Sequence, residues 1–200
     1  MINLLRKLQA NSYFYIYSSL LFCIIALLYL SGIYPIVRFT NEQIDIQVYP
    51  EYIEVDGYYT YKNPFPFSVV QGLSIPFAVD TTHFMPIQIS AKQVFVEEKP
   101  IPIRFIMGKH RFDLAFSAGE QIVVRVQYFQ YVPEKNACYI LTTTKPWESP
   151  LVEGTYRLFP EKVRIISSNY LLQSRRDGIL VFNRNNFMPE NNWHFAWEVQ

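Results

Sequence analysis

The 200-residue sequence has few of the residues that build disulfide frameworks and metal sites. It contains two cysteines, and because Cys23 lies in an apolar run while Cys138 lies in the more polar remainder, they are not expected to pair within one chain. The three histidines, His83, His110 and His194, are far apart and have no cysteine or second histidine at ligand spacing. The sequence therefore predicts no disulfide within the chain, no metal site and no cofactor. Cys138 is expected as a small buried side chain, with a bridge to another chain as the alternative.

Catalytic motifs are missing as well. The sequence has no Gly-rich phosphate loop, no G-x-S-x-G elbow and no H-E-x-x-H helix. The adjacent acids Glu97 and Glu98 would point to opposite faces of a strand, so they fit a charged turn before Pro100 better than a catalytic pair. Cys138 has no neighbouring histidine in the sequence to activate it as a nucleophile. We therefore expect a protein that is not an enzyme.

The chain also lacks a basic block, apart from the pair Arg175-Arg176. From Phe39 onward it carries 15 lysines and arginines against 17 aspartates and glutamates, because only three of the 18 basic residues precede that point. Nucleic-acid binding needs a cationic surface. No nucleic-acid partner is expected.

Charged residues are missing from Leu8 to Val37, and most of this stretch is apolar. About 20 apolar helical residues cross a hydrocarbon core of about 30 Å, so residues 13–36 are predicted to form one transmembrane helix. A cleaved signal peptide is an alternative, but YLSG at residues 29–32 is a poor cleavage site. Two further alternatives fit the run less well. Lipid attachment at Cys23 is disfavoured by its bulky neighbours, and a buried core helix would show more of a polar face.

The residues that flank the run indicate its orientation. Two basic residues precede it, and one follows closely ahead of Glu42 and Asp45, so the positive-inside rule places residues 1–12 in the cytoplasm. We expect a linker over residues 37–43 and one extracytoplasmic domain over residues 44–200. Tyrosines at both ends of the run are expected at headgroup level. The predicted membrane-interface anchors are Arg6, Lys7, Tyr13, Tyr15, Tyr34 and Arg38.

Beyond the run, apolar and polar residues alternate with the period of two that is typical of β-strands. Residues 44–48 and 53–61 show this pattern, and residues 111–117 and 121–132 show it in a form that predicts a hairpin. Helical periodicity is missing there, and only residues 168–176 fit a short helical turn. Further strands are predicted over residues 73–79, 87–90, 94–97, 103–107, 137–143, 155–159, 162–166, 178–182 and 193–199. This spacing favours an all-β domain, an antiparallel immunoglobulin-like β-sandwich.

Four short strings occur in this domain: GYYTYKNP at residues 57–64, IPF at 75–77, FSAGE at 116–120 and YILTTTKPW at 139–147. They resemble motifs of a family of bacterial extracytoplasmic domains of unknown function. The likeness covers about residues 53–160, with Thr144 where that family usually has glycine and SPL at residues 149–151 where it has GPI. The resemblance implies an envelope β-domain, here on the bacterial inner membrane. It implies no activity, because the family has none assigned.

One anchor that carries one outer domain is typical of accessory or assembly subunits. We therefore predict a non-catalytic single-pass membrane protein that contacts lipid through residues 13–36 and binds an integral membrane protein complex. Tyrosine is enriched in protein interfaces, and Tyr128 is expected on the tyrosine-rich surface. The residues predicted to contact a partner or a glycan are Trp147, Tyr58, Tyr61, Tyr131 and Tyr170. Ordinary core or edge packing is the alternative for each of them.

A cell-envelope carbohydrate-binding module is the alternative function. Exposed aromatic rings on a β-sandwich can hold a sugar face, and Trp147 lies in a Pro-bounded stretch beside Glu148. It is expected at one end of the sandwich, after the strand at residues 137–143. Trp197 alternates with polar neighbours and is expected to be buried.

Overall fold

The computed structural model describes residues 14–24, 35–75, 79–80, 85–86, 89–106 and 109–200. The chain divides into two compact units, Met1–Ile36 and Val37–Gln200.

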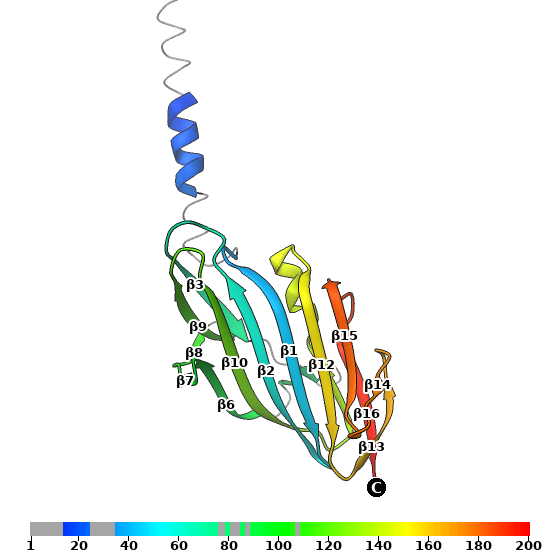
Figure 1. Cartoon of the computed structure of the whole chain (residues 1–200). Helices are drawn as coiled ribbons and strands as arrows, with labels where there is room; N and C mark the ends of the chain where they lie inside the picture. The colour runs from blue at the N-terminus through cyan, green and yellow to red at the C-terminus, as the bar shows by residue number, and fades with distance from the viewer. Residues whose placement is uncertain (1–13, 25–34, 76–78, 81–84, 87–88, 107–108) are drawn as a thin grey trace, which may run out of the picture. The chain divides into compact units, whose positions relative to one another are not determined.

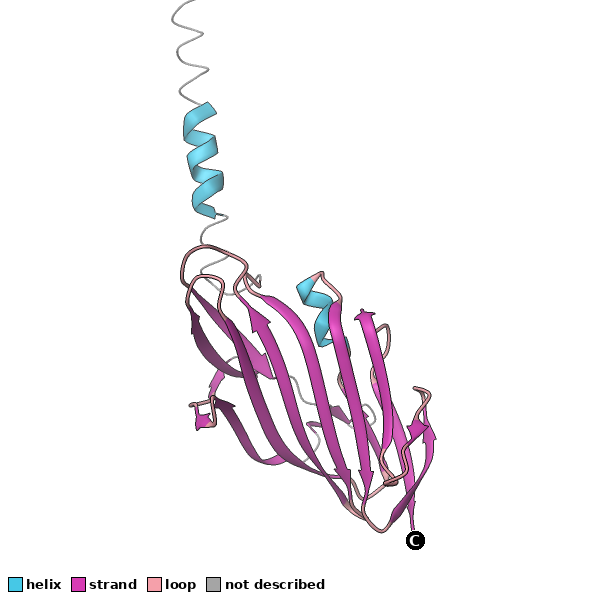
Figure 2. Ribbon diagram, in the orientation of Figure 1, coloured by secondary structure: helices cyan, strands magenta, loops and turns pink. Residues whose placement is uncertain are grey.

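In the first unit, residues 14–24 form an α-helix (Figure 2). Its large apolar side chains are exposed, from 47% for Ile24 to 73% for Phe22. Among the described residues, no helix has both the length and the hydropathy that a membrane span requires. Residues 13 and 25–34 of the predicted span lie outside the described residues, and so do the predicted anchors Arg6, Lys7, Tyr13 and Tyr34.

The second unit is built from β-strands, which confirms the all-β prediction. A 3-10 helix, η1 (Thr142–Trp147), interrupts them. The described strands are β1 (Arg38–Val48), β2 (Tyr52–Lys62), β3 (Val69–Ile75), β4 (Val79–Asp80), β5 (Met85–Pro86), β6 (Ile89–Val96), β7 (Lys99–Pro100), β8 (Arg104–Ile106), β9 (Lys109–Phe116), β10 (Gln121–Tyr131), β11 (Asn136–Tyr139), β12 (Leu151–Pro160), β13 (Val163–Ser168), β14 (Gln173–Ser174), β15 (Leu180–Phe187) and β16 (Trp193–Val199).

Eight strands form one large sheet in the order β14-β15-β12-β1-β2-β10-β6-β7 (Figure 1). Two smaller sheets have the orders β11-β16-β13 and β3-β9-β8, and β4 pairs with β5. Strand β1 pairs antiparallel with β2 but parallel with β12. The expectation of a wholly antiparallel domain is therefore wrong for the β1–β12 pair, and the immunoglobulin-like arrangement stays a prediction.

The hairpin predicted from residues 111–117 and 121–132 is also wrong. Strand β9 pairs with β3 and β8, whereas β10 pairs with β2 and β6. The turn between them therefore connects two sheets rather than two neighbours in one sheet. The alternation itself is confirmed, because Phe112, Leu114 and Val124 are all buried.

Several element boundaries differ from those expected. Strand β1 begins at Arg38, so the linker predicted over residues 37–43 is wrong. Strand β11 ends at Tyr139, and η1 begins at Thr142, so the strand predicted over residues 137–143 is shorter than expected and its last two residues are helical. Glu97 and Glu98 form the turn between β6 and β7 with positive φ angles of 50° and 59°, which confirms a charged turn there.

The core includes the contact between the large sheet and the β11-β16-β13 sheet. The ring centroid of Trp193 lies 6.0 Å from that of Tyr156 in β12 and 4.9 Å from that of Phe182 in β15. Trp197 is buried, as predicted, and its indole Nε1 has no hydrogen-bond partner among the described residues. These aromatic contacts fix the β11-β16-β13 sheet against one face of the large sheet.

Candidate functional site

A buried glutamate lies on the inner face of the large sheet. Glu42 is in phase with Ile44, Ile46 and Val48 of β1, so all four side chains point toward the core. Glu42 is 2% exposed. A carboxyl group in such a place must be satisfied by hydrogen-bond donors from the protein.

Tyrosine hydroxyls supply those donors. Tyr156 of β12 donates to Glu42 Oε2 at 2.7 Å, and Tyr139 of β11 donates to Oε1 at 3.1 Å. The hydroxyl of Tyr59 in β2 lies 2.6 Å from that of Tyr139. In register, Glu42 pairs with Tyr59 on one side and with Gly154 on the other. The acid is thus held by groups from both sheets.

Two glycines make room for these rings. Gly57 and Gly154 each lie two residues before a tyrosine of the cluster, Tyr59 or Tyr156, and therefore on the same face of the strand. A Cβ atom added at either glycine would lie 2.7 Å from the hydroxyl oxygen of that tyrosine. Each ring therefore lies over its glycine, where no larger residue fits without displacing it.

Replacing Gly154 with alanine should destabilise the protein by about 1–3 kcal/mol, because the methyl group displaces the Tyr156 ring and weakens its hydrogen bond to Glu42. Gly72→Ala is the matched control, since its Cβ would meet only flexible side-chain atoms, the nearest at 3.3 Å. Denaturant unfolding of both variants measures the difference. Equal losses at the two positions would contradict the close approach as the cause.

Burial sets the protonation of this cluster. It raises the pKa of Glu42 from 4.5 to about 7, and the hydrogen bonds from Tyr156 and Tyr139 lower it by less than burial raises it. Burial is the largest cause that raises the pKa of five tyrosines on the inner side of the domain, and the charge of Glu42 is a further cause for each of them. These are Tyr59, Tyr61, Tyr128, Tyr139 and Tyr156. All five remain neutral at physiological pH.

The hydrogen count of the network favours the ionised acid. Three oxygen–oxygen contacts join Glu42, Tyr59, Tyr139 and Tyr156. When Glu42 is ionised, each contact has one hydroxyl hydrogen: the carboxylate accepts two hydrogen bonds, and the third lies between Tyr59 and Tyr139. A protonated carboxyl would bring a fourth hydrogen, for which the network has no fourth contact. The network and the burial therefore act in opposite directions on Glu42, which leaves it titrating near neutrality. Because the acid is enclosed, this cluster affects stability rather than binding a substrate.

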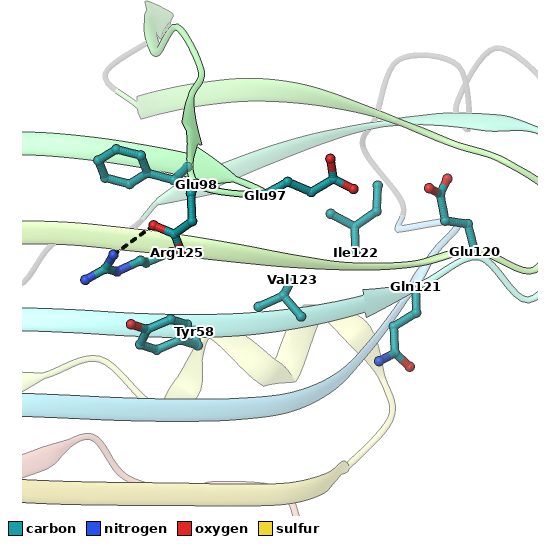
Figure 3. Close-up of a pocket in the computed structure, with 9 residues that line it drawn as sticks. Tyr58, Glu97, Glu98, Glu120, Gln121, Ile122, Val123 and Arg125 are labelled. Carbon is teal, nitrogen blue, oxygen red and sulfur yellow. Dashed lines mark hydrogen bonds and ion pairs between the residues drawn. The ribbon is translucent and has the colours of Figure 1, made fainter.

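The outer face of the large sheet carries a surface hollow of about 310 Å³ (Figure 3). Arg125 of β10 lies there between its register partners Tyr58 of β2 and Phe95 of β6. Its guanidinium carbon Cζ is 5.4 Å from the Tyr58 ring centroid and 5.9 Å from that of Phe95. The other lining residues are Glu97, Glu98, Glu120, Gln121, Ile122 and Val123.

Ion pairs hold Arg125 in place. Its Nε and Nη2 donate to the carboxylate of Asp56 at 2.9 and 2.7 Å, and its Nη1 donates to Glu98 at 3.2 Å. The hydrogen bonding to Asp56 is the largest cause that raises the pKa of the guanidinium. A charge that is already balanced suits contact with another surface better than capture of a free anion.

Further aromatic side chains share this outer face. Tyr131 and Phe129 of β10 are exposed, and Tyr52 of β2 is the register partner of Tyr131, with its ring centroid 6.2 Å from that of Phe129. We call this surface the Arg125 face. It comprises Tyr52, Tyr58, Phe95, Val123, Arg125, Phe129 and Tyr131.

Two of the tyrosines expected on the surface are buried. Tyr61 lies on the inner side of β2, with its ring centroid 5.3 Å from that of Trp147 and 5.1 Å from that of Phe39. Tyr128 lies on the inner side of β10. Their surface placement was wrong because the strand period turns both toward the core. Tyr58 and Tyr131, in contrast, lie on the Arg125 face.

The rings of Trp147 and Tyr170 each pack against other aromatic rings of the domain. Trp147 follows β11, as predicted, but it is the last residue of η1 and does not lie in the expected loop. It is half-buried, with its ring centroid 5.8 Å from that of Phe39. Tyr170 stacks on Phe182 at 4.8 Å and donates to the Asn191 carbonyl at 2.9 Å. The structure therefore brings Trp147 to Tyr61 rather than leaving it as an open platform.

Strand pairing brings Cys138 and His194 together, which the sequence did not predict. They are register partners in β11 and β16, and Cys138 Sγ lies 3.7 Å from His194 Nε2. Burial raises the pKa of the Cys138 thiol, and a hydrogen bond with Asn192 offsets this only in part. A protonated thiol is a poor nucleophile. Among the described residues, no three potential ligands converge as a metal site, and His83 lies outside them.

Comparison with known proteins shows the fold alone. No family model and no curated protein matches the chain. A solved structure of a candidate nutrient-binding protein from Legionella pneumophila is similar with a TM-score of 0.66 and 14% identity, over 82% of this chain and 67% of that one. An M1 zinc metallopeptidase from Deinococcus radiodurans gives a TM-score of 0.46 and 12% identity, over 80% of this chain and 42% of the metallopeptidase.

Proposed function

We propose that this protein is a non-catalytic, single-pass membrane protein of the bacterial inner membrane whose extracytoplasmic domain binds an integral membrane protein through the Arg125 face. The anchor is supported by the charge-free run from Leu8 to Val37 and by the exposed apolar side chains of residues 14–24. Such side chains are stable where lipid or another apolar helix covers them.

The observation that carries the binding role is the composition of the Arg125 face. Protein interfaces are enriched in tyrosine, phenylalanine and arginine, and their strongest contacts come from rigid anchors. Arg125 is fixed by Asp56 and Glu98 on a strand within the large sheet, so little side-chain entropy is lost when a partner covers it. Because the Trp147 ring packs on Tyr61, a protein partner is better supported than a carbohydrate.

Photo-crosslinking in intact membranes tests the binding face. A photoreactive residue at Tyr58, Val123 or Tyr131 should form adducts with an integral membrane protein. The same residue at Ile166 or Leu171, which are also exposed, should not. Adducts of equal yield from both sets of positions, or from the control positions alone, would count against the Arg125 face.

Cysteine labelling tests the orientation. In a Cys23→Ser/Cys138→Ser background, Leu171→Cys should react with a membrane-impermeant maleimide in intact spheroplasts, because Leu171 is 80% exposed and its domain is expected outside the cytoplasm. Asn3→Cys should react only after permeabilisation. The reverse pattern would show that the proposed topology is wrong.

A further inference from the structure

Two exposed phenyl rings lie in the loop after β2. Phe65 and Phe67 are 37% and 57% exposed, and their rings stack with centroids 5.1 Å apart and planes at 16°. Single exposed apolar side chains are ordinary on protein surfaces, whereas adjoining ones form a patch that gains from being covered. This pair belongs neither to the Arg125 face nor to the core.

A buried asparagine holds the loop in shape. Asn63 is fully buried, and its Nδ2 donates to the carbonyl oxygens of Phe67 and Ser117, both at 2.7 Å. Its Oδ1 accepts from the backbone N–H of Phe65 at 3.0 Å, and the N–H of Gly119 donates to the Phe65 carbonyl at 3.0 Å. A proline before each phenylalanine restricts the backbone further. The two rings are therefore held exposed in a preorganised loop.

A basic pair lies at the base of this loop. Arg38, the first residue of β1, is the register partner of Lys62, the last residue of β2, and both are exposed. Like charges directly opposite each other on a sheet repel, so an anion bound beside the pair would relieve this repulsion. Figure 2 shows the loop after β2 at the end of the large sheet where β1 begins.

Chain connectivity keeps this end of the domain near the proposed anchor. If the span ends at Ile36, Arg38 follows two residues later, and Phe65 follows three residues after the register partner of Arg38. An extended residue covers at most about 3.6 Å and paired strands lie about 5 Å apart. Phe65 therefore stays within about 25 Å of the membrane boundary in every orientation of the domain.

We propose that Phe65 and Phe67 insert into the interface of the bilayer that holds the anchor, with Arg38 and Lys62 beside the phosphates of anionic lipid. Aromatic rings are favoured at headgroup level, and basic residues are attracted to anionic lipid surfaces. This inference rests on the proposed anchor at residues 13–36 and gives the domain a second, independent contact with lipid.

Depth-dependent fluorescence quenching tests the loop in the full-length protein. Phe67→Trp and the matched control Phe105→Trp, at a position 68% exposed in β8, are reconstituted in phosphatidylglycerol vesicles with brominated acyl chains. After subtraction of the wild-type emission, bromine should quench the added signal of the Phe67→Trp variant and leave that of the Phe105→Trp variant unchanged. Equal quenching of both signals, or of neither, overturns the inference.

Two further measurements test the basic pair and the anchor separately. The Arg38→Glu and Lys62→Glu substitutions are combined with Phe67→Trp. Bromine should no longer quench the added tryptophan signal in phosphatidylglycerol vesicles, but it should still do so in phosphatidylcholine vesicles. Quenching that is unchanged in both lipids overturns the role of the basic pair.

Flotation of the vesicles reports on the anchor. A chain that floats without quenching overturns the loop insertion alone, whereas a chain that does not float overturns the proposed anchor as well.

Discussion

The titration of Glu42 should lower the unfolding free energy of the protein by about 2–3 kcal/mol as the pH rises from about 5 to about 8, and the Glu42→Gln variant should lack this loss. Burial raises the pKa of Glu42 to about 7 in the folded protein, against 4.5 for the free side chain. Between these two pKa values, each unit of pH lowers the unfolding free energy by about 1.4 kcal/mol. Denaturant unfolding of the detergent-solubilised full chain, repeated across this pH range, measures the loss.

The sign follows from which state holds the proton. Well below pH 4.5 Glu42 is protonated in both the folded and the unfolded state, and the stabilisation is fully present. As the pH rises, the unfolded chain releases its proton first while the folded chain keeps it until about pH 7, so stability falls over this interval and then levels off.

His110 is the internal check on this experiment. Its pKa is lowered by burial and by Lys92, so its contribution increases stability as the pH rises through the same range. Glu42→Gln retains His110, and the difference between the two proteins therefore isolates Glu42. Parallel pH profiles for the wild type and the variant would show that Glu42 does not titrate in this window.

The position of Glu42 was partly within reach of the sequence. The alternation of Ile44, Ile46 and Val48 places residue 42 on the same face, and a charged residue in phase with an apolar face is a sign of a buried polar site. Its tyrosine partners could not be predicted, because Tyr139 and Tyr156 lie about 100 residues away and meet Glu42 only through the parallel β1–β12 pair and the second sheet.

Strand faces were predictable where strand neighbours were not. A period of two determines which side chains share a face, and Phe112, Leu114 and Val124 are buried as that period predicts. It does not determine whether two strands joined by a short turn pair with each other or with distant strands. The contact between Cys138 and His194 was missed for the same reason, because register across β11 and β16 is a long-range property.

Replacing Val124 with aspartate should cost about 4 kcal/mol or more and prevent cooperative folding under ordinary conditions. Val124 is 1% exposed and lies between its register partners Tyr59 and Val96, so the new carboxylate would be buried without a cationic partner in that position. Loss of the apolar contacts adds to this cost. Thermal unfolding monitored by far-ultraviolet circular dichroism of the full-length protein measures the effect.

Val123→Asp is the matched control, because it places the same side chain one residue earlier in the same strand. Val123 is 45% exposed on the Arg125 face, opposite Thr60, so its replacement should cost less than about 1 kcal/mol. A slip of one residue would exchange the two faces of β10 and reverse the two results. Greater damage from Val123→Asp than from Val124→Asp would therefore contradict the register of β10 that turns Tyr128 inward and Arg125 outward.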